Sequence, residues 1–284
     1  LFYDKFADIP LLSRMDAVAE TFIDEIETLL NRDLPEEERI PLIEKFRKMY
    51  ETMDFYVLYN RFLKKEGYQT LPRRPLEKRK LRYEDVYPVL YLKYRLSRQA
   101  ERSNIKHLVI DEMQDYSRLQ YLIIRRMFSC KMTILGDRAQ TMADQQQDVL
   151  QFLPGIFGKD LRRIEMRKSY RNTVEIASYA ANLIGVTDLE LFERHGMPVL
   201  ERDVTDLEAA LREAVDTLFP EEKTYETAAV IVPDEKTAER AYLILREILA
   251  EKDFDCEKRL SWLNRDSSSF KKGLTVTTFY LAKG

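Results

Sequence analysis

The stretch HLVIDEMQDYSRLQ (residues 107–120) joins a short apolar run to a group of acids. The run 108–110 reads Leu-Val-Ile, which predicts a β-strand that is buried on both faces. The run ends directly at Asp111 and Glu112, and Asp115 follows soon after. Carboxylates are costly to bury without a partner, so these acids call for a positive charge nearby. The stretch therefore predicts a strand that is followed, at its carboxyl end, by acidic residues.

Around this stretch, short apolar runs alternate with segments of helical periodicity. From residue 105 the expected order is three strand–helix pairs, followed by helix, strand, helix and a final strand. These segments are 105–110, 117–128, 131–136, 144–157, 162–167, 172–184, 206–219, 226–233, 236–250 and 273–284. The alternation predicts an α/β fold with a parallel sheet that helices cover on both faces. Because the last strand has no helix after it, we expect the chain to be a fragment of a longer protein.

The first part of the chain has a different pattern. Between residues 11 and 65, apolar residues recur at a spacing of three and four, which is typical of helices. Pro35 precedes three Glu and marks a helix start, so we expect two or three packed helices here. A further helix is expected over residues 83–100, begun or interrupted at Pro88. We therefore predict a helical subdomain over residues 1–85.

The composition is that of a globular protein. A chain of 284 residues with 45% hydrophobic content can form one large domain or two smaller ones. It has neither a run of eighteen apolar residues nor a secretory signal, so we expect a cytosolic protein that does not enter a membrane. Because Cys130 and Cys256 lie far apart and the chain has only two His, we expect neither a zinc site nor a structural disulfide.

One segment is strongly basic, although the formal net charge of the chain is -3. Residues 61–82 contain nine Lys or Arg against two Glu, with Phe62 and Tyr68 among them. Cations interleaved with aromatic rings are typical of surfaces that bind a nucleic-acid backbone. They are equally typical of a solvated face that keeps an acidic protein soluble. Both interpretations stay open from the sequence.

The acids of the opening stretch are candidates for a ligand site. In open parallel sheets, ligands bind at the carboxyl ends of the strands. There Asp111 and Glu112 would lie beside Asp137 and Gln140, which follow the next strand in GDRAQ (residues 136–140). A pair of acids after a strand can hold Mg²⁺ with its nucleotide and position water for attack on a phosphate. The alternative is that the acids cap a helix N-terminus and bind nothing.

A second candidate is the stretch RKSYRNTVEIASYA (residues 167–180). Its Tyr170 and Arg171 come after an expected strand and before an expected helix. Such an arginine can reach a phosphate, and such a tyrosine can stack on a base. The alternative is that Arg171 pairs with a neighbouring acid and that Tyr170 fills a gap in the core.

In sequence order, DEMQD, GDRAQ and SYRNT resemble the motifs of superfamily-one helicases of the UvrD and Rep type. These families also carry a T-x-H-x-x-K-G motif after a later strand, and this chain has TFYLAKG with Thr278, Tyr280 and Lys283. The tyrosine in place of histidine is closest to the HelD-like branch, whose members act on RNA polymerase. The resemblance covers residues 83–284. It implies a RecA-like (P-loop NTPase) fold, with motor domains over residues 86–168 and 169–284 and an inserted helical subdomain before them.

The resemblance also implies roles for particular residues. Asp111, with Glu112, would hold Mg²⁺, and Glu112 would act as the base that orients the attacking water. Gln140 would sense the γ-phosphate of ATP. Tyr170 would stack on adenine, and Arg171 would stabilise the transferring phosphate.

Other motif residues would have supporting roles. Gln114 and Asp115, with Asp137, would link strand ends to one another without doing chemistry. Thr278 and Lys283 would lie near the nucleic acid or at a domain interface. The implied track is DNA, either single-stranded or at a junction between single and double strands, and RNA polymerase is a further expected partner.

The chain departs from these families in one respect. It contains no Gly-Lys-Ser or Gly-Lys-Thr, the end of the loop that cradles the phosphates of ATP. We therefore expect weak binding of Mg²⁺-ATP and no detectable turnover by this chain alone.

Two functions other than that of an ATP-driven nucleic-acid motor are alternatives. The first is a catalytically inactive scaffold with the helicase fold that binds RNA polymerase or another protein. The second is a metal-dependent nuclease built on Asp234 and Glu235 of VPDEK (residues 232–236). Asp234 is better explained as the cap of the helix that follows it.

Overall fold

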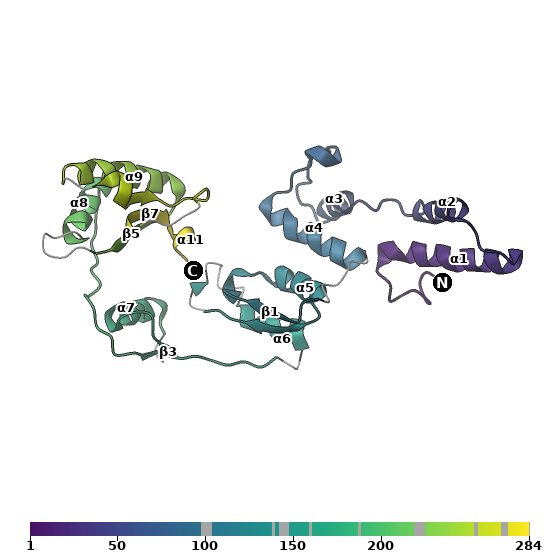
Figure 1. The fold of residues 1–284 in the computed structure, drawn as a ribbon, viewed down its shortest axis with the longest axis horizontal. Coiled ribbons are helices and arrows are strands. Elements are labelled where there is room, and N and C mark those ends of the chain that lie inside the picture. Colours follow the sequence, from purple (N-terminus) through teal and green to yellow (C-terminus); the bar gives the residue numbers. More distant parts are fainter. Residues whose placement is uncertain are drawn as a thin grey trace. The chain divides into compact units, whose positions relative to one another are not determined.

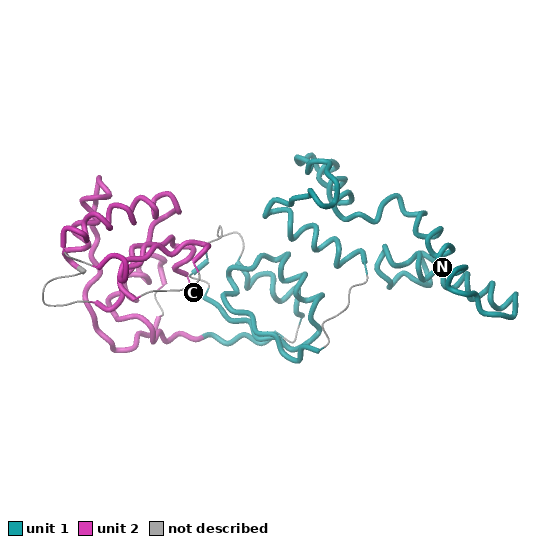
Figure 2. Tube along the Cα trace, turned by 45° about the horizontal axis from the view of Figure 1, so that its top comes forward, with its two compact units in different colours: residues 1–165 teal, residues 166–284 magenta. Residues whose placement is uncertain are grey.

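The chain forms two compact units, residues 1–165 (unit 1) and 166–284 (unit 2), which Figure 2 colours separately. Each unit has its own hydrophobic core and at least one small sheet. The computed structural model describes residues 1–97, 104–137, 140–141, 148–158, 161–186, 189–218, 225–252, 255–267 and 272–283.

The first part of unit 1 is helical (Figure 1), as the periodicity predicts. Helix α1 packs against α2, and α3 packs against α4. Helix α2 begins directly after Pro35, so the predicted helix start is confirmed. The elements are η1 (Leu11–Ser13), α1 (Arg14–Leu30), α2 (Glu36–Arg47), α3 (Phe55–Lys65), η2 (Leu76–Lys78) and α4 (Tyr83–Leu96).

Helix α4 corrects the prediction made at Pro88. The helix begins at Tyr83 and runs through Pro88 without a break. A proline inside a helix removes one backbone hydrogen bond, at a cost of roughly 3 kcal/mol. Packing of α4 against α3 and α5 (Arg118–Met127) offsets this cost, which the local sequence does not reveal. The last residues of the expected helix, 98–100, lie outside the described residues.

The second part of unit 1 contains the opening stretch. Strand β1 (His107–Ile110) pairs with β2 (Lys131–Ile134) in parallel, with Ile110 opposite Ile134. Between them lie η3 (Met113–Asp115) and α5 (Arg118–Met127), and α6 (Val149–Phe157) follows β2. Ile110 and the fully buried Tyr121 form a core cluster with residues of α6. The predicted helix over residues 144–157 is thus present from Val149, and its earlier part lies outside the described residues.

Burial of β1 on both faces was predicted and is wrong. Of its four residues only Ile110 is buried, and Val109 is 59% exposed. Ile110 contributes to the cluster with α5 and α6, which therefore cover one side of β1. In the described part of unit 1, β1 has a single neighbouring strand, β2.

Unit 2 contains two further parallel sheets. Strand β3 (Lys168–Ser169) pairs with β4 (Glu190–Leu191), and the other sheet has the order β5-β7-β6. Its central strand β7 is buried along all six residues and packs against α9. The remaining elements are α7 (Val174–Ile184), α8 (Leu207–Leu218), β5 (Thr227–Val232), α9 (Glu235–Ala250), α10 (Cys256–Arg259), β6 (Leu260–Trp262), β7 (Gly273–Thr278) and α11 (Phe279–Ala282).

Two more predictions are corrected. Residues 162–167 form no strand, and Ile164 and Met166 are each 87% exposed. Only the next two residues pair, as β3 with β4, and within the predicted segment the carbonyl of Arg167 accepts from the N–H of Glu190 at 3.1 Å. The final strand ends at Thr278 and is followed by the short helix α11, so the expectation of a last strand without a helix is also wrong.

The architecture is a mixture of helices and small parallel sheets, as the α/β prediction requires. All the described strand pairs are parallel. Among the described residues, no helix combines the length and apolar character needed to cross a membrane.

Candidate functional site

The carboxyl ends of β1 and β2 are joined beyond the strands themselves. The backbone N–H of Leu135 donates to the carbonyl of Ile110 at 2.8 Å, and the N–H of Met113 donates to the carbonyl of Leu135 at 2.8 Å. The DEMQD and GDRAQ stretches therefore lie against each other, as expected for successive parallel strands.

Glu112 turns the chain sharply at this edge. Its backbone is left-handed, with φ 51° and ψ 51°, which costs a residue with a side chain about 1 kcal/mol. The N–H of Glu112 donates to Oδ1 of Asp111 at 2.8 Å. The turn places Met113 and Gln114 in the interior, while Asp111 and Asp115 are exposed. The acids at these two positions are thus in contact with water, and the predicted problem of buried carboxylates does not arise there.

Gln114 connects the two stretches through both ends of its amide. It is 6% exposed. Its Nε2 donates to Oε2 of Glu112 at 2.5 Å, and its Oε1 accepts from the backbone N–H of Asp137 at 3.0 Å. One buried side chain thereby holds the Glu112 carboxylate in a fixed relation to the end of β2.

The connection continues to Gln140. Its Nε2 donates to Oδ2 of Asp137 at 3.0 Å. Hydrogen bonds therefore run from Glu112 through Gln114 and Asp137 to Gln140. We call these four residues the polar edge. The arrangement can align one carboxylate with an amide group that belongs to the neighbouring strand.

Gly136 permits this close approach, and the sequence analysis assigned it no role. A Cβ at this position would lie 2.5 Å from Oε1 of Gln114 and 2.6 Å from the backbone nitrogen of Met113. Neither distance is compatible with a side chain. A glycine directly after an apolar strand is the available signal for such a contact.

The buried side chain of Tyr121 is hydrogen-bonded to the backbone next to the polar edge. The hydroxyl of Tyr121 donates to the carbonyl of Met113 at 3.0 Å, and burial raises the pKa of this phenol far above its ordinary value. The phenol therefore stays protonated and remains a donor.

The acids are not needed to cap the helix that follows them. Ser117 is the N-cap of α5: its Oγ accepts from the N–H of Gln120, whose side chain accepts from the N–H of Ser117 at 2.7 Å. This capping box satisfies the start of α5. Neither acid caps α5, and Glu112 stands at the N-cap position of η3 without a capping hydrogen bond from its side chain.

The donor set at this edge suits a magnesium ion that also binds a phosphate. Mg²⁺ is usually held by one or two carboxylates together with waters and substrate phosphates. Asp111 and Glu112 supply two carboxylates, and Asp111 is exposed. The described residues contain no group of three or more His, Cys, Asp or Glu that would hold a metal by itself. A metal held by these two carboxylates would complete its coordination with water or with oxygen atoms of a substrate.

Tyr170 and Arg171 lie in unit 2, directly after β3. Tyr170 is 60% exposed, with its ring 5.8 Å from that of Phe192 and Nζ of Lys168 5.6 Å from its centre. Arg171 is exposed and forms no ion pair with the described residues. The alternative, in which the tyrosine fills the core and the arginine pairs with an acid, is therefore not found in the described structure.

The last motif also lies in unit 2. Thr278 is the final residue of β7 and is 5% exposed, whereas Tyr280 on α11 is 64% exposed. Lys283 follows α11, and Gly284 lies outside the described residues.

The nuclease interpretation rested on Asp234, which the structure assigns to helix capping. Its carboxylate accepts from the N–H of Thr237 at 2.9 Å and from the Thr237 hydroxyl at 3.0 Å. The predicted cap of α9 is thus confirmed.

Residues 11–142 match the family model of the UvrD/REP helicase N-terminal domain. The match covers a little under half of the chain and includes both DEMQD and GDRAQ. It begins in the helical part of unit 1, so the predicted start of the resemblance at residue 83 was too late. No curated protein matches the chain. Over these residues the chain is therefore similar to UvrD-like helicases.

Proposed function

We propose that the chain is part of an ATP-dependent translocase or helicase, in which ATP hydrolysis drives movement on DNA. The polar edge carries this proposal, because it fixes Glu112 beside a neighbouring strand while Asp111 faces solvent. The family match over residues 11–142 supports the same class of function.

In this proposal, Asp111 and Glu112 would hold Mg²⁺-ATP, and the bound metal would supply positive charge next to the phosphates. Glu112 accepts a proton from the attacking water and orients it. Gln114 donates to the Glu112 carboxylate and keeps it from rotating away. General-base catalysis by a positioned carboxylate contributes about 10² to 10⁴ in rate.

The remaining assignments belong to the same proposal. Gln140 contacts the γ-phosphate, Arg171 stabilises the transferring phosphate, and Tyr170 stacks on adenine. Thr278 and Lys283 lie near the nucleic acid or a domain interface. These roles require two RecA-like motor domains, over residues 86–168 and 169–284, with the helical part as an inserted subdomain.

The sequence contains no Gly-Lys-Ser or Gly-Lys-Thr, with which the loop that binds the ATP phosphates would end. We place in this chain only part of the ATP site, so the chain alone should not turn over ATP. Tyr280, in the position where UvrD-type motifs have histidine, favours the HelD-like branch, with RNA polymerase as a protein partner.

The test uses the complete gene product that contains this chain. ATP hydrolysis is measured with and without single-stranded DNA for the wild type and for Glu112→Gln. We expect stimulation by DNA and a loss of at least a hundredfold in turnover for the variant. The matched control is Glu25→Gln, an exposed residue of α1 that makes no described contact, and its turnover should equal that of the wild type.

Absence of turnover in the wild type, or equal turnover in Glu112→Gln, would overturn the proposal. The carboxylates would then have no catalytic role, and the inactive scaffold would become the better interpretation.

A further inference from the structure

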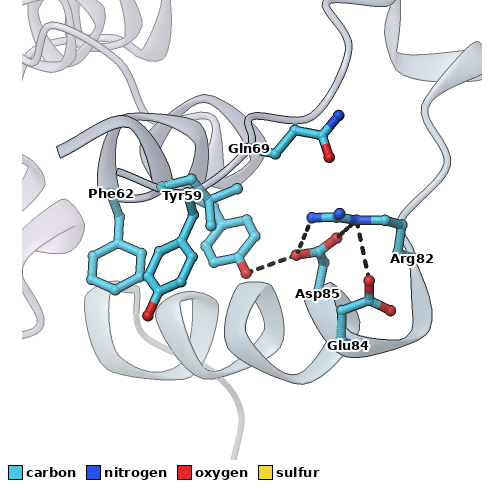
Figure 3. A pocket seen from close by; sticks show the side chains of 8 residues that line it. Tyr59, Phe62, Gln69, Arg82, Glu84 and Asp85 are labelled. Carbon is cyan, nitrogen blue, oxygen red and sulfur yellow. Dashed lines mark hydrogen bonds and ion pairs between the residues drawn. The ribbon is translucent and has the colours of Figure 1, made fainter. Parts of the chain in front are cut away.

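A pocket of about 370 Å³ opens in the helical part of unit 1 (Figure 3). It lies between α3, the loop after α3 and the start of α4. Apolar and aromatic side chains form much of its lining, with Gln69 and Glu84 among the polar groups. Its volume is within the range of small-ligand sites, about 300 to 1,000 Å³.

The charged groups of the pocket are held by one another. Tyr59 donates its hydroxyl to Oδ1 of Asp85 at 2.8 Å, and Nε of Arg82 donates to Oδ2 at 2.6 Å, as Figure 3 shows. Asp85 is only 2% exposed. Burial, with the hydrogen bond to Asp85, raises the pKa of Tyr59 to about 12, so the phenol stays a donor. This network therefore gives the pocket a preformed wall.

Two aromatic side chains of the lining remain open to solvent. Phe62 is 49% exposed and Tyr68 is 65% exposed, whereas Tyr59 is buried. The rings of Tyr59 and Phe62 are stacked, with centroids 6.2 Å apart. Exposed flat rings at the edge of a pocket are suited to stacking on a planar ligand.

The loop beside the pocket is fastened to α3. Tyr56 donates its hydroxyl to the carbonyl of Pro72 at 2.7 Å. The side chain of Asn60 accepts from the N–H of Leu71 at 2.7 Å and donates to its carbonyl at 3.3 Å. Further along, Arg79 pairs with an acid at the start of α3 at 2.6 Å. The loop therefore presents its side chains from a defined position.

The loop and the adjoining end of α3 display cations that have no acidic partner. Of the nine basic residues over 61–82, Arg61, Arg79 and Arg82 form ion pairs. The other six are exposed and make no ion pair with the described residues. They are Lys64, Lys65, Arg73, Arg74, Lys78 and Lys80. None of the six lines the pocket, but they belong to the same stretch, residues 59–85, that forms it. Together with the open aromatic rings of the pocket, these cations point to a ligand that is both polyanionic and planar.

We propose that this pocket accepts an unstacked base of single-stranded nucleic acid, while the six cations neutralise the phosphates on either side of that base. The site lies within the stretch that matches the helicase family but involves none of the polar-edge residues. It rests on the nucleic-acid binding of the proposed function and is independent of ATP chemistry.

The test measures binding by fluorescence anisotropy, without nucleotide, with the complete gene product. The probes are a labelled thymidine oligonucleotide and a labelled oligonucleotide of equal length whose central positions are abasic. Tyr68→Ala should weaken binding of the first probe by about tenfold and leave binding of the abasic probe unchanged. The control is Tyr3→Ala, which removes a similarly exposed tyrosine that does not line the pocket.

The phosphate contacts have a separate test. The double variant Lys64→Gln, Lys65→Gln should weaken binding of both probes and make the slope of log K against log salt shallower by about 1.4. Lys45→Gln with Lys48→Gln removes the same charge from exposed positions on α2 and just after it, and it should leave the slope unchanged. Tyr68→Ala should also leave the slope unchanged.

Equal weakening of both probes by Tyr68→Ala, or no weakening of either, would overturn the base site. Binding of poly-L-glutamate with loss of DNA binding would also overturn it, in favour of an acidic protein partner. Glu112→Gln should bind both probes like the wild type. A failure of the ATP proposal therefore remains distinguishable from a failure of this one.

Discussion

The β1–β2 pair of unit 1 and the β5-β7-β6 sheet of unit 2 begin from similar apolar runs and differ in burial. Every residue of β7 is buried, and Val276 is 0% exposed. In β1 only Ile110 is buried, and Val109 is 59% exposed. Side-chain hydrogen bonds join neighbouring strands in both places: Gln114 accepts from the N–H of Asp137 in unit 1, and the Thr277 hydroxyl donates to the carbonyl of Leu263 in unit 2.

The difference separates a buried sheet that stabilises unit 2 from an exposed edge to which the proposed function assigns the chemistry. Strand β7 lies between two strands and against α9, so it contributes buried packing, and its Thr275 and Thr277 hydroxyls are hydrogen-bonded toward β6. The polar edge depends on few buried groups, chiefly Gln114 and Tyr121, and leaves Asp111 in contact with solvent. A site that must admit a charged substrate benefits from such an open edge.

Removing packing from unit 2 should have the largest effect. Leu245→Ala truncates a side chain of α9 that is 0% exposed, and it should lower the free energy of unfolding by about 2 to 5 kcal/mol. Urea unfolding followed by fluorescence of Trp262, the single tryptophan of the chain, reports on unit 2. The matched control is Val109→Ala, which should leave this transition in place. A transition that shifts equally in both variants would contradict the separation.

A smaller loss of stability is expected at the polar edge. Gly136→Ala introduces a methyl group against Gln114 and the backbone of Met113, so it should cost about 1 to 3 kcal/mol. The measurement is urea unfolding followed by circular dichroism, with the Trp262 transition unchanged. Gly155→Ala is the control, since a Cβ in α6 meets nothing within 4 Å and should not destabilise. Equal destabilisation by both variants would argue against a tight contact at Gly136.

The smallest of these effects is on turnover. Gln114→Leu keeps a buried side chain of similar size but removes both hydrogen bonds of the amide. Because Glu112 then loses its fixed position, ATP turnover by the complete gene product should fall by roughly tenfold. Gln151→Leu on the exposed face of α6 is the control and should be neutral. Unchanged turnover in Gln114→Leu would show that the polar edge does not position Glu112.

Local signals predicted the elements that depend on local chemistry. The cap at Asp234 and the start of α2 after Pro35 were both correct, because capping and proline geometry involve neighbours in sequence. The strand over 162–167 was wrong because an apolar pattern does not provide a pairing partner, and Ile164 is left 87% exposed. Strand β6 was missed because the alternation of Leu260, Ser261 and Trp262 is too short to identify a strand.

The sequence predicted which residues lie at the candidate site, but it did not predict the backbone conformation and close contacts that hold them there. The strand order brings Glu112 and Gln140 to one edge, which follows from parallel topology alone. The left-handed backbone of Glu112 and the closeness of Gly136 to Gln114 depend on how two strand ends meet. The ATP-linked roles of these residues stay predictions.

The two-sided contact of Gln114 restricts what evolution can place there. One end of the side chain accepts from a backbone N–H, and the other donates to a carboxylate. Glutamate has almost the same shape, but it would bring a second negative charge against Glu112 in place of a donor. Position 114 therefore distinguishes glutamine from glutamate by hydrogen-bonding polarity and not by size. A glutamate there, although conservative in size, would disrupt the contact with Glu112.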